Sequence, residues 1–180
     1  MKNKLGVFLF TALLLLVLPA LAQYAGNFWV RIIDFALSNC LNSGLRQMAV
    51  LIQYKSHSLD RHIRTGWNIL NPELGEYIVS VPPQQRISEE WYRGTADAVY
   101  QNLFLLDNDH PEFLLVLAGD HIYKMNYADM YNLLIEKQAD AVVGAIETPL
   151  ADANRFGVIA VDKDRRILSF DEKPDKPMHI

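Results

Sequence analysis

The sequence predicts an α/β fold of three-layer, Rossmann-like type, with a mostly parallel sheet between two layers of helices. Short apolar runs alternate along the chain with segments whose apolar residues recur at the helical period. Parallel strands need helical crossovers, so this alternation favours a parallel sheet that is covered on both faces. The length of 180 residues suits one domain, or part of a larger one.

The first expected elements have clear boundaries in the sequence. Residues 34–46 carry apolar side chains near helical spacing, and residues 48–52 form a compact apolar run typical of a buried strand. Ser56–Gly66 is expected to be a helix, because Ser56 can cap it and a glycine closes it. The region that follows is expected to be mostly loop, because it contains several prolines, with one strand at Tyr77–Val81.

The second half continues the same alternation. Thr95 opens an expected helix to residue 106, with the acidic Asp97 in its first turn, where a negative charge is favourable. The remaining expected elements are a strand at 113–117, a helix at Tyr127–Lys137, a strand at 141–147, and a hairpin of residues 158–161 and 167–170 around the polar turn 162–166.

Composition and charge exclude some classes of function. The net charge of −4 gives no electrostatic support for binding nucleic acid or an anionic membrane surface. A single cysteine, Cys40, excludes an internal disulfide, and its place in a helical pattern indicates a small buried side chain rather than a reactive thiol. The five histidines show no spacing typical of metal ligands.

The N-terminal segment has the three parts of a secretory signal. Lys2 and Lys4 precede an uncharged apolar run over residues 5–18, and a small-x-small pattern ends at Ala22. The run is shorter than the ~20 residues that a membrane-spanning helix needs. Residues 1–22 are therefore interpreted as a signal peptide; an uncleaved short membrane anchor and an artefactual gene start remain as alternatives.

Asp120 lies at the carboxyl end of an expected strand, where a carboxylate can take part in ligand binding. The apolar run that ends at Ala118 is followed by Gly119 and Asp120, so a buried strand carries Asp120 at its carboxyl end. Ligands bind at this edge of open α/β sheets, and a carboxylate there can hold a divalent metal against phosphate oxygens. The alternative for Asp120 is a helix cap for the segment that follows.

A second motif, Trp-Tyr-Arg-Gly-Thr-Ala-Asp at residues 91–97, opens a helix. Gly94 and Thr95 would present backbone N–H groups at the positive end of that helix, which suits an anion or the edge of a nucleotide. As isolated residues they are more often a turn and a cap. Elsewhere, the amides of Gln84 and Gln85 are able to read a base edge.

Seven segments in the same order resemble the sugar-nucleotide pyrophosphorylases, and most closely the bacterial glucose-1-phosphate adenylyltransferases (ADP-glucose pyrophosphorylases). The segment at 91–98 and the sequence Leu-Ala-Gly-Asp-His-Ile-Tyr at 117–123 are the most specific. The segments that carry the resemblance are residues 31–40, 53–57, 83–86, 91–98, 118–123, 156–158 and 172–174.

The resemblance implies an activity and a set of site residues. The family transfers the adenylyl group of ATP to glucose 1-phosphate with Mg²⁺, giving ADP-glucose and pyrophosphate for glycogen synthesis. It implies Asp120 as the catalytic, metal-binding aspartate and Arg31 and Gln53 as allosteric positions. It also implies contacts to glucose 1-phosphate from Tyr92, Gly157, Glu172 and Lys173, and to the nucleotide from Gln84, Gln85, Gly94 and Thr95.

The sequence departs from the family pattern in three features. The Gly-rich loop that holds the triphosphate in the family is missing, as are the second metal-binding aspartate and the C-terminal β-helix domain used in tetramers. The expected organisation is thus a signal-like segment 1–22, a junction 23–30 and a nucleotidyltransferase domain 31–180 that is truncated at both ends. The lost first strand would be central, and residues 13–18 are candidates to fill its place.

The resemblance leaves two functions open. The chain is either a nucleotidyltransferase, cytoplasmic as its family is, or an inactive fragment that retains sugar-phosphate binding or associates with full-length subunits. Loss of the triphosphate loop favours low activity, because catalysis of this kind depends on positioning and electrostatics.

Overall fold

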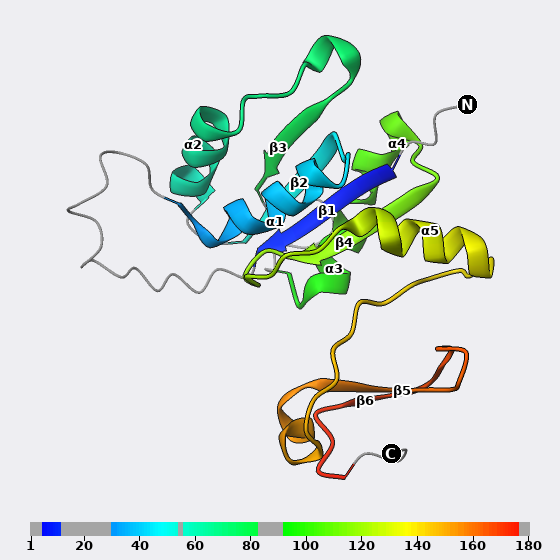
Figure 1. Cartoon of the computed structure of the whole chain (residues 1–180). Coiled ribbons are helices and arrows are strands. Elements are labelled where there is room, and N and C mark those ends of the chain that lie inside the picture. Colours follow the sequence, from blue (N-terminus) through cyan, green and yellow to red (C-terminus); the bar gives the residue numbers. More distant parts are fainter. Residues whose placement is uncertain (1–4, 12–29, 54–55, 83–91, 177–180) are drawn as a thin grey trace. The chain divides into compact units, whose positions relative to one another are not determined.

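The computed structural model of the chain describes residues 5–11, 30–53, 56–82 and 92–176. Two units, Met1–Gln138 and Ala139–Ile180, are described separately below. The strands of the first unit are β1 (Leu5–Thr11), β2 (Gln47–Ile52), β3 (Tyr77–Val81) and β4 (Phe113–Ala118). Its α-helices are α1 (Ile32–Asn42), α2 (Ser56–Gly66), α3 (Thr95–Gln101), α4 (Leu106–Asp109) and α5 (Tyr127–Lys137) (Figure 1).

The sheet of the first unit is parallel throughout, as predicted. Its strand order is β3-β2-β1-β4, and β1 pairs in parallel with β2 on one side and β4 on the other. The chain therefore adds strands in one direction from β1 to β3 and then returns to place β4 on the opposite side of β1. This reversal between β1 and β4 is the topological switch point of a doubly wound sheet.

The central strand comes from the segment that resembles a secretory signal. Residues 5–11 pair along their length with β2 and with β4, from Leu5 opposite Phe113 to Phe10 opposite Ala118. They occupy the first-strand position for which residues 13–18 were the expected candidates. Residues 1–4 and 12–29, which complete that apolar segment, lie outside the described residues. Within the described part of the chain, no helix is both long and apolar enough to span a membrane.

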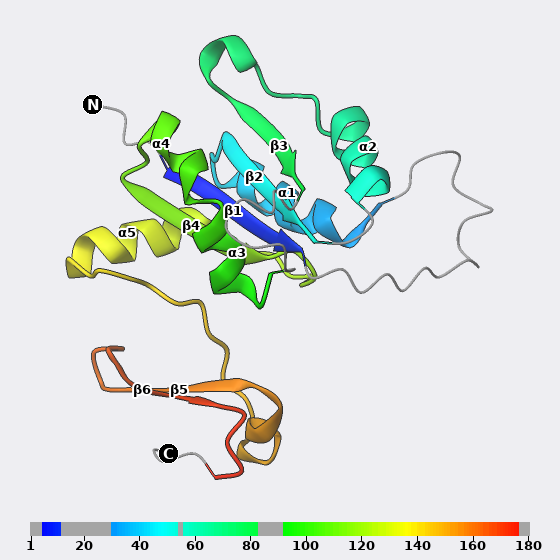
Figure 2. The same ribbon diagram turned by 180° about the vertical axis from the view of Figure 1, so that it is seen from behind.

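Two apolar clusters, one on each face of the sheet, make the three predicted layers. Side chains of β2 alternate between them, as the pleat of a strand requires. Met48, Val50 and Ile52 pack with α1, α2 and Tyr127 of α5, whereas Ala49 and Leu51 pack with Ala98 of α3. Figures 1 and 2 show the same arrangement, with α1 and α5 on one face and α3 and α4 on the other.

Two helices end earlier than the sequence predicts. Helix α1 stops at Asn42 instead of residue 46, because Gly44 adopts a left-handed backbone conformation at φ 83°. Helix α3 stops at Gln101, and the expected continuation becomes a short 3-10 turn (Leu103–Leu105) followed by α4. The side chain of Asn102 donates to the carbonyl of Ala98, and such side-chain competition for backbone groups favours a helix end.

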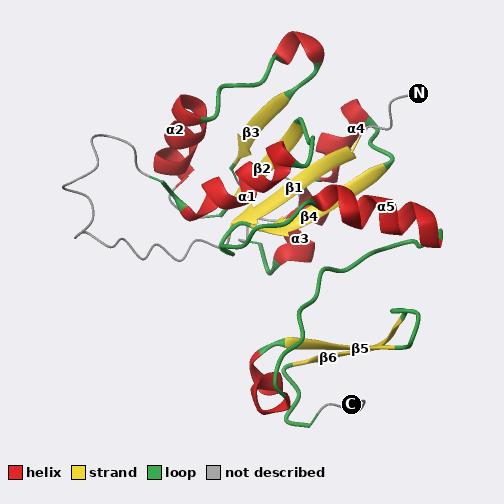
Figure 3. Cartoon of the chain, viewed as in Figure 1, coloured by secondary structure: helices red, strands yellow, loops and turns green. Residues whose placement is uncertain are grey.

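The second unit contains the predicted hairpin, formed by β5 (Gly157–Val161) and β6 (Ile167–Glu172) in antiparallel pairing (Figure 3). A 3-10 helix, Leu150–Arg155, precedes it. The predicted strand at 141–147 is wrong: this stretch has no regular secondary structure, and Val143 and Ile146 are 55% and 85% exposed. Apolar residues alone do not make a strand, which needs a neighbouring strand to satisfy its backbone groups.

Candidate functional site

Asp120 lies just beyond the carboxyl end of β4, next to the switch point of the sheet. The pairing of Phe10 with Ala118 brings the ends of β1 and β4 together at this edge. The side chain of Asp120 is 45% exposed, and its Oδ1 atom lies 3.7 Å from Nε2 of His121. The carboxylate is thus placed at the edge where open α/β sheets bind ligands, and it is accessible from solvent.

The chemistry of this edge fits a magnesium ion that is shared with a nucleotide. In the described ranges no three acidic, histidine or cysteine side chains gather into a preformed metal cluster. Mg²⁺ commonly binds through one or two carboxylates, with waters and substrate phosphates completing its octahedron. A single accessible carboxylate at Asp120 meets that requirement when the remaining ligands come from the nucleotide.

The Gly-Thr motif opens α3, as predicted. Gly94 is the N-cap of the helix, and a Cβ built on it would meet nothing within 4 Å. Asp97 in the first turn accepts hydrogen bonds from the backbone N–H of Arg93 (2.9 Å) and from Nε2 of Gln101 (3.0 Å). Asp97 therefore fixes the turn, while Gly94 and Thr95 remain exposed.

The structure places Tyr92 in the apolar core. Its side chain is 6% exposed, and its hydroxyl accepts a hydrogen bond of 3.0 Å from Nδ2 of Asn102. Nε2 of Gln53 donates to the carbonyl oxygen of Tyr92 at 3.2 Å, so two residues predicted for different roles are in contact. Packing thus accounts for the Tyr92 ring, and its contact with glucose 1-phosphate stays a prediction. Gln84 and Gln85 lie outside the described residues.

In the second unit the structure brings together the three remaining residues predicted to bind the sugar phosphate. Gly157 pairs directly with Glu172 across the hairpin, and the backbone N–H of Lys173 donates to the carbonyl of Phe156 at 3.0 Å. Nζ of Lys173 lies 3.6 Å from Oε1 of Glu172, and both side chains are mainly exposed. Lys173 also has a positive φ of 47°, which turns the chain sharply after β6.

Gly157 lies beneath two side chains of β6, Phe170 and Glu172. A Cβ at this residue would come within 2.8 Å of Cε2 of Phe170 and 3.1 Å of Oε2 of Glu172. Phe170 is 61% exposed, so its ring has room to move away from an added methyl group. A larger residue would nevertheless displace the Glu172 carboxylate.

A hydrogen-bonded centre at Asp34, at the start of α1, was not predicted from the sequence. Oδ1 of Asp34 accepts from Nε2 of His62 and from Nε1 of Trp67, both at 2.7 Å, and Oδ2 accepts from the backbone N–H of Arg31 at 2.7 Å. Nη2 of Arg31 in turn donates to Oγ of Ser58 at 2.9 Å. This centre ties α1 to α2 and fixes Arg31, the predicted allosteric residue.

Replacing Asp34 by alanine is expected to destabilise the first unit by about 1–3 kcal/mol, because the half-buried Trp67 indole and His62 imidazole lose their acceptor. Urea unfolding followed by tryptophan fluorescence measures this loss. The matched control is Glu136→Ala on the exposed end of α5, which should change stability by less than about 0.5 kcal/mol. Equal effects of the two changes would contradict a structural role for Asp34.

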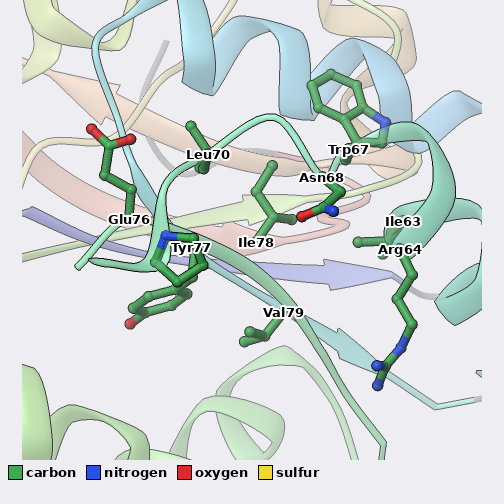
Figure 4. Close-up of a pocket in the computed structure, with 10 residues that line it drawn as sticks. Ile63, Arg64, Trp67, Asn68, Leu70, Glu76, Tyr77, Ile78 and Val79 are labelled. Atoms are coloured by element: carbon green, nitrogen blue, oxygen red, sulfur yellow. The ribbon is translucent and has the colours of Figure 1, made fainter. Parts of the chain in front are cut away.

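A pocket of about 340 Å³ opens where α2 meets β3. Figure 4 shows Trp67, Leu70 and Ile78 among its lining side chains, with Arg64 and Glu76 as its charged groups. None of the residues predicted for the site lines it. We assign the pocket no part in the chemistry at the carboxyl edge.

Among the described residues, the side chains of Cys40, Tyr127 and Asp60 have shifted pKa values. Burial raises the pKa of the Cys40 thiol to about 12, so the thiol stays protonated at neutral pH and is not a nucleophile. Burial, followed by the hydrogen bond to Tyr123, raises the pKa of Tyr127. The hydroxyl of Ser80, followed by the guanidinium of Arg64, lowers the pKa of Asp60.

Comparison with known proteins gives a consistent family. The model of the family described as nucleotidyl transferase matches residues 18–179. The chain is 55% identical over 154 residues to glucose-1-phosphate adenylyltransferase of Methylococcus capsulatus, covering 86% of this chain and 36% of that protein. It is 54% identical over 160 residues to the enzyme of the same name from Paramagnetospirillum magneticum, covering 88% of this chain and 37% of that protein.

A third relative, glucose-1-phosphate adenylyltransferase of Rhodopirellula baltica, is 55% identical over 148 residues, which cover 82% of this chain and 33% of that protein. The matched residues of the chain thus span about a third of the length of these curated relatives. The similarity extends over the segments that form β2, β3 and β4 and over the carboxyl edge that carries Asp120.

Proposed function

This chain belongs to the nucleotidyl transferase family, and we propose that it carries part of the site that transfers the adenylyl group of ATP to glucose 1-phosphate. The products would be ADP-glucose and pyrophosphate, the precursor and by-product of glycogen synthesis. The observation that carries the proposal is the position of Asp120, an exposed carboxylate at the switch point of a parallel sheet. The names of the most similar relatives support the choice of ATP and glucose 1-phosphate.

The reaction joins two anionic partners. A phosphate oxygen of glucose 1-phosphate attacks the α-phosphorus of ATP, and the bond to the β,γ-pyrophosphate breaks as the new P–O bond forms. Bound Mg²⁺ would supply charge neutralisation at the phosphates and at the leaving pyrophosphate. Asp120 would hold that ion, and the exposed backbone of Gly94 and Thr95 at the start of α3 would face the nucleotide.

The base and the sugar phosphate would be recognised by separate groups. Gln84 and Gln85 are proposed to read the adenine edge through their amides. Lys173 would pair with the phosphate of glucose 1-phosphate as a point charge, and Glu172 would accept hydrogen bonds from sugar hydroxyls. Gly157 would keep the surface beside them free of a side chain, and a Cβ there would lie 3.1 Å from Oε2 of Glu172.

Further parts of the proposal concern regulation and setting. Arg31 and Gln53 are proposed as allosteric positions, and the guanidinium of Arg31 is a suitable phosphate ligand. From the family we also propose assembly with other subunits into a homo-tetramer and a cytoplasmic location, where ATP and glucose 1-phosphate are available.

One observation favours a second candidate, which is binding without turnover. The sequence between β1 and α1, residues 12–31, contains a single glycine, Gly26, and no Gly-rich phosphate loop. In the family that loop follows the first strand. Without it, the triphosphate has fewer preorganised donors, and the rate should fall more than the affinity for the sugar phosphate.

Calorimetry and a pyrophosphate-release assay on the full chain distinguish the two candidates. The proposed activity requires binding of glucose 1-phosphate and of ATP with Mg²⁺, together with release of pyrophosphate when both are present. Binding of glucose 1-phosphate without pyrophosphate release would support the second candidate. Binding of neither ligand would contradict both.

Replacing Lys173 by alanine is expected to weaken glucose 1-phosphate binding about tenfold or more, because a charge-assisted bond to the phosphate is lost. Titration calorimetry measures the change. Lys163→Ala, an exposed lysine in the turn between β5 and β6, is the matched control and should bind as the wild type does. Equal affinity of the Lys173 variant and the wild type would remove Lys173 from the site.

A further inference from the structure

Asn39 is a buried polar residue of α1 whose side chain serves another segment of the chain. It is 7% exposed, and its Nδ2 atom donates to the carbonyl oxygen of Tyr123 at 2.9 Å. Its Oδ1 atom accepts from the backbone N–H of Met125 at 3.5 Å. Both bonds go to the segment that leads away from Asp120. We propose that Asn39 is a positioning residue that holds Asp120 in place, an inference that rests on the proposed metal role of Asp120.

The backbone around Asp120 is fixed at two points. Upstream, Leu117 and Ala118 pair with Leu9 and Phe10 in the parallel ladder of β4 and β1. Downstream, the amide of Asn39 holds Tyr123 and Met125. Asp120 therefore lies in a short span between the two anchors, and in Figure 1 this span leads from the end of β4 back along α1 towards α5.

The side chain of Asn39 suits a positioning role better than a packing role. A buried amide costs free energy unless its donors and acceptors are satisfied, and an apolar residue would fill the same space without that cost. The amide of Asn39 bonds to backbone atoms of the loop at residues 123–125 and to the hydroxyl of Tyr127, rather than to its own helix. Removing it would release the downstream anchor and spread the carboxylate of Asp120 over several positions.

A second contact between the same helix end and the same segment offers a control. Oγ of Ser43 accepts from the backbone N–H of Tyr127 at 2.8 Å, where α5 begins. The hydroxyls of Tyr123 and Tyr127 lie 2.6 Å apart and join the two contacts. The Ser43 contact holds the start of α5 and lies farther along the chain from Asp120, so its loss should leave the carboxylate in place.

The test uses Mn²⁺, which accepts the oxygen ligands of Mg²⁺ and is detected directly by electron paramagnetic resonance. Its dissociation constant is measured on the full chain in the presence of ATP for the wild type, Asn39→Ala, Ser43→Ala and Asp120→Asn. Loss of a group that orients a metal ligand typically weakens binding about 10–100-fold, and this is expected for Asn39→Ala. The dissociation constant of Mn²⁺ for Ser43→Ala should stay within about twofold of the wild-type value. That result would support the same inference.

Each other outcome decides against the inference. Mn²⁺ binding by Asn39→Ala as tight as by the wild type would overturn it and leave the role of Asp120 intact. Mn²⁺ binding that is absent in the wild type, or unaffected by Asp120→Asn, would overturn the metal role of Asp120 and the inference with it. Circular dichroism confirms folding, and Asn39→Ser, which keeps a small polar group, replaces Asn39→Ala if that variant does not fold.

Discussion

Replacing Val7 by proline is expected to abolish cooperative folding of the first unit. Val7 lies in the centre of β1 and pairs with Met48 of β2 and with Leu115 of β4. Proline lacks the N–H of the ladder and is confined to edge strands or bulges, so at a central position it leaves a buried carbonyl unpaired, which costs about 1–3 kcal/mol before any clash of its ring. Domains of this size have about 5–15 kcal/mol of total stability, so the loss is a large share of it.

Val7→Ala is the matched control, because it keeps the backbone N–H that proline removes. Urea unfolding, followed by circular dichroism, should give a far lower midpoint for Val7→Pro than for Val7→Ala. The same midpoint for Val7→Pro and the wild type would show that residues 5–11 are outside the sheet in solution. The interpretation of the segment as a signal peptide would then regain support.

The second large effect is expected from Asp120→Asn, which should weaken binding of ATP with Mg²⁺ by about 100-fold, at the upper end of losses around metal sites. The amide has the same shape as the carboxylate but loses the negative charge that favours a divalent cation. The fold should be unaffected, because the side chain is 45% exposed and its neighbour His121 is 3.7 Å away. Titration calorimetry measures the change in affinity.

Asp107→Asn is a suitable control for this substitution. Asp107 is an exposed residue of α4, which precedes β4 and so lies towards the amino end of that strand rather than at the carboxyl edge. Its replacement should leave nucleotide binding unchanged. If Asp120→Asn bound ATP with Mg²⁺ as tightly as the wild type, the assignment of the metal to the end of β4 would be wrong.

Several elements could be predicted from the sequence with their boundaries. Ser56–Gly66, Tyr77–Val81 and Tyr127–Lys137 occur as expected, because each has a clear apolar pattern and a cap, glycine or proline nearby. The parallel sheet also followed from the alternation of such patterns. The end of α3 could not be foreseen, because it depends on where the side chain of Asn102 finds its partners.

The first strand shows where a sequence pattern becomes ambiguous. A strand buried in the middle of a parallel sheet is a continuous apolar run, and the core of a signal peptide is one too. Residues 5–11 satisfy both descriptions, and only their pairing with β2 and β4 separates them. The prediction of a strand at 141–147 was wrong for a different reason. The sequence pattern there resembles a strand, but no described strand pairs with it.

The positions of some candidate residues could be predicted because a local sequence pattern indicates them. The position of Asp120 follows from the strand that ends before it, and Gly157, Glu172 and Lys173 meet at one end of the predicted hairpin, while their role stays a prediction. Asn39 and Asp34 were missed, because their partners lie far along the chain. Asn39 and Tyr123 are 84 positions apart, and no spacing in the sequence indicates that they meet.

Hydrogen–deuterium exchange of the amides of residues 5–11 in the full chain tests the central claim most directly, because the switch point at Asp120 exists only if β1 lies between β2 and β4. A central strand exchanges by global unfolding, so these amides should be protected as strongly as those of β2. Exchange at the rate of an unstructured peptide would contradict the account, since β2 and β4 would then lack the strand that joins them.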